Sequence, residues 1–185
     1  MLIYDMVQDY QLTKDLEIPY IPLNTNEPDV VLYNKYKQHI ELLEEFAKSK
    51  YDSDRHLVRE IISYIDSDPY YQNDEAYFKI NECLSYIKDS SEKMKLRWSA
   101  YLLQVADYVN IAWEAGSLVG AGRGSGVGFC LLNILGITQI NPLREKTQTF
   151  PWRFLNPERA SVLDIDIDIM SSMRDKVIQA LKDQY

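Results

Sequence analysis

Two short stretches of the chain bring together residue types suited to phosphate and metal chemistry. The first runs from Gly120 to Gly128 and reads GAGRGSGVG. Glycine accepts positive φ angles and lets backbone N–H groups approach an anion closely, and Ser125 adds a hydroxyl donor. A short apolar segment precedes this loop, and an apolar helix is expected after it, so the pattern predicts a cradle for phosphate groups.

A glycine-rich turn packed against its neighbours is the alternative interpretation of this loop. The segment lacks the Lys-Ser/Thr ending of a nucleotide P-loop, and its glycines do not satisfy the GxGxxG spacing in any register. Dinucleotide binding is therefore disfavoured.

The second stretch runs from Asp164 to Asp168 and reads DIDID. On a strand, residues two apart face the same way, so the three carboxylates would share one face. Adjacent like charges repel each other, and Mg²⁺, which prefers oxygen ligands, would remove that repulsion and serve in-line phosphoryl transfer. For this motif alone, an acidic, solvent-facing edge strand is an equally open interpretation.

The distribution of charge is more informative than its sum. The chain has 185 residues and a net charge of −8, which taken alone argues against binding a polyanion. Residues 120–160, however, carry five basic and two acidic side chains, whereas residues 161–185 carry three basic and five acidic ones. A phosphate cradle, then basic side chains, then paired carboxylates together are what nucleotidyl transfer requires.

Helices are expected to make up most of the chain before these motifs, with loops and extended segments over residues 1–28. Apolar residues recur at helical spacing, and we expect four helices, over about 29–50, 52–66, 74–88 and 90–113. Further elements are expected as a strand near 117–119, a helix over 129–135, a basic loop over 137–161, a strand over 163–169 and a helix after Ser171-Ser172.

Other features of the sequence disfavour several classes of protein. No run approaches the roughly 20 apolar residues of a membrane helix, and the N-terminus lacks the features of a secretory signal. Cys83 and Cys130 lack metal-type spacing and are expected to be buried thiols in a reducing cytoplasm. His39 and His56 are interpreted as surface or core residues rather than as ligands.

The region from Tyr101 to Tyr185 resembles the palm of the C-family replicative DNA polymerases of bacteria and phages, the alpha subunit of bacterial DNA polymerase III. The resemblance rests on five ordered motifs: YLLQVADY, VGAGRGSGVG, LGITQINPL, RFLNPER, and DIDID with the following RDKVI. More weakly, the region from about Ile18 to Ile65 resembles the passage that leaves the family's N-terminal phosphoesterase-like domain.

This resemblance implies an α+β fold, in which a helical N-terminal portion precedes a partial polymerase-beta-like nucleotidyltransferase palm with a mixed sheet and helices. Residues 1–50 would form the connector that leaves the phosphoesterase-like domain. Residues 51–185 would form the first part of the palm domain and end before the thumb. The implied reaction is DNA-directed DNA synthesis by a two-metal mechanism, in which a primer 3′-hydroxyl attacks the α-phosphate of a dNTP.

The resemblance also implies roles for individual side chains, with Mg²⁺ as the cofactor. Asp164 and Asp166 would be the catalytic, metal-binding aspartates, and Asp168 would be a third, supporting metal ligand. Gly124 and Ser125 would contact the incoming triphosphate. The arginines implied to face the triphosphate or nearby backbone are Arg153 and Arg159 and, more weakly, Arg123 and Arg174.

The sequence departs from the family's pattern in two places, and it does not reach the later strand that carries the family's third catalytic aspartate. Leu163 stands where proline is usual, and Pro151-Trp152 precede Arg153 where an acidic residue is common. The chain is therefore expected to be a polymerase fragment, inactive alone, whose partners are dNTP, primer–template DNA, a missing C-terminal portion and other replisome subunits. The alternative is a non-catalytic remnant or binding module that pairs with or interferes with a replicative polymerase.

Overall fold

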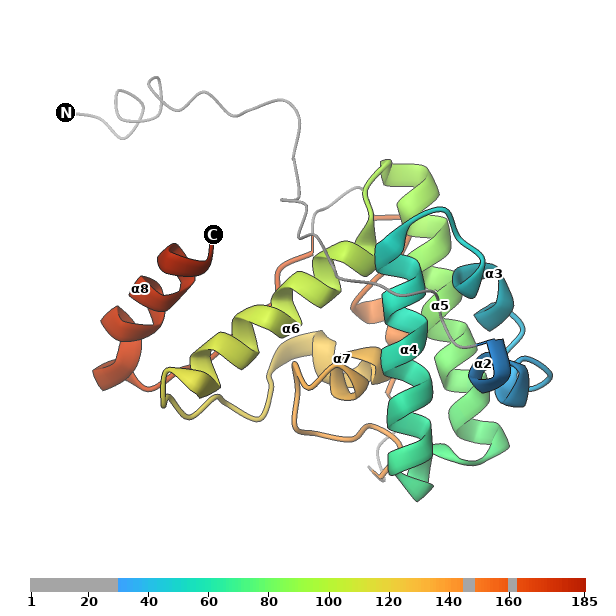
Figure 1. The fold of residues 1–185 in the computed structure, drawn as a ribbon, viewed down its shortest axis with the longest axis horizontal. Helices are drawn as coiled ribbons and strands as arrows, with labels where there is room; N and C mark the ends of the chain where they lie inside the picture. The colour runs from blue at the N-terminus through green and yellow to red at the C-terminus, as the bar shows by residue number, and fades with distance from the viewer. Residues whose placement is uncertain (1–29, 145–148, 160–162) are drawn as a thin grey trace.

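The structure is a computed structural model that describes residues 30–144, 149–159 and 163–185. Helices dominate these residues (Figure 1), and their bounds are α2 (Val30–Tyr36), α3 (Leu43–Ala47), α4 (Asp52–Ser67), α5 (Asp74–Met94), α6 (Trp98–Glu114), α7 (Cys130–Ile134) and α8 (Arg174–Gln184). Short 3-10 turns lie at Pro69–Tyr71, Gly124–Gly128, Pro151–Arg153 and Ser171–Met173. Within the described parts of the chain, no helix is long and apolar enough to cross a membrane.

Three long helices, α4, α5 and α6, form the body of the molecule. In α4 the buried residues Leu57, Ile61 and Ile65 recur four apart, so one stripe of the helix faces the core. The start of α5 is capped by Asn73, whose side chain accepts a hydrogen bond from the Ala76 N–H at 3.0 Å. The short helices α2 and α3 contact α4, α7 contacts both α4 and α5, and α8 contacts α6 at the opposite end from α2 (Figure 1).

The apolar stripe expected on the fourth helix is confirmed along most of α6. Trp98, Leu102 and Val109 are almost completely buried, and they belong to the same core cluster as the buried residues of α4 and α5. Trp113 is the exception, because 40% of it is exposed. The two cysteines are free and buried, as expected, and their sulfur atoms lie 3.5 Å apart where α5 meets α7.

Two of the expected helix boundaries are wrong. The stretch expected as one helix over 29–50 holds two, α2 and α3, with a turn between them. Residues 90–94 continue α5 instead of starting the next helix. Ser90 and Ser91, which were expected to begin that helix, are buried within α5. The helix ends at Met94, and the next residue, Lys95, adopts the left-handed conformation with φ +54°. The domain boundary expected near residue 50 stays a prediction, and residues 1–29 lie outside the described part.

The expected α+β fold with a mixed sheet is wrong for the described residues. Apart from loops and turns, these residues form helices. They contain no strand and only one isolated antiparallel bridge, between Val119 and Ile169. The segment 163–169 still behaves locally as the alternation predicts, since its acidic side chains are exposed and its apolar ones half-buried. A strand needs a hydrogen-bonded partner along its length, and among the residues that the structure describes this segment has a single bridge, to Val119.

Candidate active site

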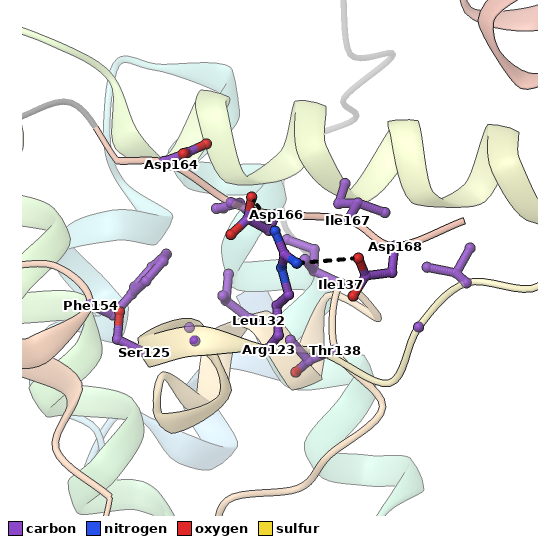
Figure 2. Close-up of a pocket in the computed structure, with 16 residues that line it drawn as sticks. Arg123, Ser125, Leu132, Ile137, Thr138, Phe154, Asp164, Asp166, Ile167 and Asp168 are labelled. Carbon is purple, nitrogen blue, oxygen red and sulfur yellow. Dashed lines mark ion pairs between the residues drawn. The ribbon is translucent and has the colours of Figure 1, made fainter. Parts of the chain in front are cut away.

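The glycine-rich loop and the acidic segment form two walls of one pocket of about 140 Å³ (Figure 2). The two walls come from positions far apart in the sequence, on either side of α7 and the loops that follow it. Most residues that the sequence singled out for a role in catalysis line this pocket: Arg123, Gly124, Ser125, Asp164, Asp166 and Asp168.

Hydrogen bonds to both ends of the acidic segment hold it against the rest of the molecule. At one end, the Tyr101 hydroxyl on α6 donates to the Leu163 carbonyl oxygen at 3.1 Å. At the other end, the Met170 N–H donates to the Ser117 hydroxyl oxygen at 3.1 Å. Burial, and then the nearby charge of Asp164, raises the pKa of Tyr101. The carboxylates are thus exposed on a segment whose backbone is fixed at both ends.

A close backbone contact joins the two walls directly. The Gly120 N–H donates to the Asp168 carbonyl oxygen at 2.8 Å. A Cβ atom added at Gly120 would stand 2.9 Å from the Asp168 Cβ, which is closer than real Cβ atoms approach. Position 120 therefore has to be glycine if the loop and the segment are to lie this close.

The loop itself takes its shape from two glycines with positive φ, Gly122 at +126° and Gly124 at +69°. These angles favour glycine strongly over any residue with a side chain. The helix expected over 129–135 is present as α7, but it has only five residues, and a 3-10 turn precedes it. A helix this short has a small dipole, so the expected contribution of a helix N-terminus to anion binding is weaker than the sequence indicated.

Arg123 bridges the two walls by ion pairing. Its Nη2 atom lies 2.9 Å from Asp166 Oδ1, and its Nη1 atom lies 3.6 Å from Asp168 Oδ1. The hydrogen bond to Asp166 and the charges of both carboxylates raise the pKa of Arg123. Figure 2 shows the guanidinium directed at these two aspartates, while Asp164 lies further along the segment. All three paired side chains are at least half exposed, so solvent screens the interaction.

The sequence from residue 37 to residue 185 matches the family described as the bacterial DNA polymerase III alpha NTPase domain. The chain belongs to this family. The resemblance drawn from the five motifs is thereby confirmed, and the pocket that four of these motifs line is a site within a DNA polymerase III alpha NTPase domain.

Individual relatives of this domain are named as DNA polymerases. A probable DNA polymerase, YorL, of Bacillus subtilis (strain 168) is 30% identical over the whole chain, which covers 15% of that relative. The DNA-directed DNA polymerase of Bacillus phage SPbeta matches to the same extent. The DNA polymerase III subunit alpha of Bacillus subtilis (strain 168) is 41% identical over 60% of the chain, which covers 9% of that relative. The chain thus spans only a small part of the curated relatives it matches.

The remaining predicted residues of the polymerase site are not part of the pocket lining. Arg153, at the end of a 3-10 turn, and Arg159 are exposed and do not line the pocket, and Arg174 is exposed at the start of α8. Among the described residues, no group of three or more His, Cys, Asp and Glu side chains converges closely enough to hold a metal ion. The metal-ligand assignment of the three aspartates stays a prediction.

Several lining residues were missed by sequence reasoning. Phe154 lines the pocket and packs its ring against Phe129, with the ring centroids 5.0 Å apart. Leu132 and Thr138 also line it. Phe154 lies within RFLNPER, one of the motifs that this family shares, so the motif could have marked it, but apolar residues carry no chemical signal of their own.

Proposed function

We propose that this chain carries the nucleotide-binding and metal-binding side of a DNA polymerase active site. The reaction would be the transfer of a deoxynucleotide from a dNTP to a primer 3′-hydroxyl. The observation that carries this proposal is the shared pocket, in which the glycine loop with Ser125 and the acidic segment with Asp164 stand as two walls. Membership of a polymerase family and the names of the relatives support the reaction class.

The glycine loop would hold the triphosphate of the incoming nucleotide. Gly124 brings the backbone around at a positive φ, and the exposed Ser125 hydroxyl can donate to a phosphate oxygen. A pocket of about 140 Å³ is smaller than the roughly 300–1,000 Å³ of typical small-molecule sites, so it would take the phosphates and leave the sugar and base outside. Arg153 and Arg159, outside the lining, would contact the triphosphate or the DNA backbone.

The acidic wall suits a divalent cation on one observation, which is that a cationic guanidinium already bridges Asp166 and Asp168. Asp164 and Asp166 would hold Mg²⁺, with Asp168 in support. Mg²⁺ bound there would neutralise phosphate charge and favour attack of the primer hydroxyl.

Binding measurements on the 185-residue chain test this proposal directly. We expect calorimetric titration to show binding of Mn²⁺, a common substitute for Mg²⁺, and fluorescence to show binding of a labelled dATP analogue in its presence. Asp166→Asn should weaken Mn²⁺ binding about tenfold or more, because it removes a charged oxygen ligand. The matched control is Asp74→Asn on α5, which makes the same change at a side chain that is 98% exposed and should bind as the wild type does.

Two outcomes of these measurements would count against a polymerase site. Equal Mn²⁺ binding by Asp166→Asn and the wild type would remove Asp166 from the metal site. Absence of both metal and nucleotide binding at millimolar concentrations would leave the chain as a non-catalytic binding module. Because the pocket holds only part of a nucleotide, we expect the chain alone to extend no primer even when it binds both.

A further inference from the structure

Arg123 lies between Asp166, one of the two carboxylates that the proposed cation would need, and Asp168, which would support it. Its two terminal nitrogens face Asp166 Oδ1 at 2.9 Å and Asp168 Oδ1 at 3.6 Å. These carboxylate oxygens are the same kind of ligand that a divalent cation takes. A divalent cation bound there would also be repelled by a guanidinium charge a few ångströms away. Arg123 and a cation at Asp166 therefore compete for one place.

Arg123 also has a second possible partner, because it belongs to the loop that would hold the triphosphate. It stands two residues before Ser125, between Gly122 and Gly124, both of which have positive φ. In Figure 2 its guanidinium is directed at the acidic segment and away from Ser125. To donate to a phosphate held at Ser125, the guanidinium would turn toward the loop and give up at least part of its pairing with Asp166.

The ion pairs that hold Arg123 are weak enough to be exchanged. The side chains of Arg123, Asp166 and Asp168 are 55%, 51% and 60% exposed, so water and salt screen their attraction. A triphosphate carries several negative charges and accepts bidentate hydrogen bonds from a guanidinium, so it can compete for this arginine.

We propose that Arg123 is a shared cation that pairs either with Asp166 and Asp168 or with the triphosphate. Nucleotide binding would then draw Arg123 off the carboxylates and open them to the divalent cation. Arg123 is a positioning residue in this scheme, and it couples the binding of the two ligands. The inference rests on the proposed function, since it assumes that the loop takes a triphosphate and the acidic segment a cation.

Arg123→Gln tests the proposal, because it should move the two affinities in opposite directions. Without nucleotide, the variant should bind Mn²⁺ about three- to tenfold more tightly than the wild type in calorimetric titration, since the internal competitor is gone. In EDTA, without any divalent cation, it should bind a fluorescent dATP analogue several-fold more weakly, because a donor to the phosphates is lost. A general disturbance of the fold would weaken both.

Two further variants serve as controls. Arg123→Lys keeps the positive charge and should retain Mn²⁺ affinity close to that of the wild type. Arg144→Gln makes the same Arg-to-Gln change at a half-exposed arginine that pairs with Asp68 at 3.6 Å outside the pocket lining, and it should change neither affinity. Thermal unfolding of each variant checks that the fold is kept.

The outcomes separate this inference from the function on which it rests. A wild-type chain that binds neither Mn²⁺ nor nucleotide overturns both. A wild-type chain that binds both ligands, with Mn²⁺ affinity unchanged or weaker in Arg123→Gln, overturns the inference and leaves the function standing. Nucleotide binding in EDTA that is absent in the wild type, or equal in wild type and variant, also overturns it, because Arg123 then has no second partner.

Discussion

The substitution Gly120→Ala tests whether the glycine loop and the acidic segment lie side by side, as the site requires. The Gly120 N–H donates to the Asp168 carbonyl oxygen at 2.8 Å. The added Cβ would stand 2.9 Å from the Asp168 Cβ, and ordinary contacts of a Cβ begin near 3.4 Å. The two segments must therefore move apart by about half an ångström, because a Cβ lies at the root of its side chain and cannot swing aside as a side-chain tip can.

The expected loss of stability follows from two contributions. Forcing extra atoms into a close contact costs about 1–3 kcal/mol, and loss of one backbone hydrogen bond costs about 0.5–1.5 kcal/mol. The segments relieve part of this by separating, so we expect the free energy of unfolding to fall by about 2 kcal/mol. For a domain of this size, about 1 kcal/mol lowers Tm by roughly 2–4 °C, so the expected drop is roughly 4–8 °C.

Thermal unfolding and hydrogen exchange together measure the effect. Hydrogen exchange at residues 117–121 should accelerate in Gly120→Ala, because the Gly120 N–H loses its acceptor. The matched control is Gly126→Ala, whose Cβ would also meet a neighbour at 2.9 Å. That neighbour is Leu132 Cδ1, the tip of a buried side chain rather than the root of one, so the leucine has to shift within the core at a cost of about 1 kcal/mol while the loop and the acidic segment stay in contact.

A Gly120→Ala chain with the Tm of the Gly126→Ala control and unchanged exchange at residues 117–121 would refute this reasoning. It would mean that the loop and the segment do not touch in solution. The proposed polymerase site would then lose the observation that carries it.

Three further substitutions probe the nucleotide site, the core and the pH response. Arg153→Gln should weaken binding of a fluorescent dATP analogue in the presence of Mn²⁺ several-fold, and an unchanged Kd would remove Arg153 from the nucleotide site. Tyr71→Phe should lower the free energy of unfolding in urea by about 1–2 kcal/mol, since the buried Tyr71 hydroxyl donates to Asn133 Oδ1 at 3.0 Å; no loss would mean that this bond contributes nothing. Burial lowers the pKa of His56, although Glu60 opposes it. The unfolded chain therefore takes up a proton at His56 at higher pH than the folded chain does, and stability falls as pH drops below about 6.5. His56→Gln should make that fall shallower between pH 7 and pH 5, and an equally steep fall would assign it to other groups.

The helices could be predicted from the sequence because their apolar periodicity is local. The stripe through Trp98, Leu102 and Val109 repeats at the spacing of a helix whatever packs against it, and the structure buries it. The start of α6 could not be found in the same way. Ser90 and Ser91 resemble a helix cap in sequence, yet they lie within α5, and a three-residue link over 95–97, which begins with the left-handed Lys95, separates the two helices.

The strand over 163–169 was predicted from its alternation, whereas the mixed sheet was implied by the family resemblance. The alternation from Asp164 to Ile169 sets which side chains face solvent, and the structure keeps that alternation. Hydrogen bonding along a strand depends on what lies beside it, and within the described residues Ile169 pairs only with Val119. A local pattern therefore predicted the orientation of the side chains but not the presence of a sheet.

The residues of the candidate site could be predicted from their motifs. The contacts that Gly120 and Arg123 make with the aspartates could not. An acidic segment that only kept an edge soluble would need neither a glycine opposite Asp168 nor an arginine between its carboxylates. The structure has both, with Gly120 in contact with Asp168 and Arg123 between Asp166 and Asp168. The arginine favours a cation-binding surface over a merely solvated one, because the carboxylates of Asp166 and Asp168 already hold a positive charge between them.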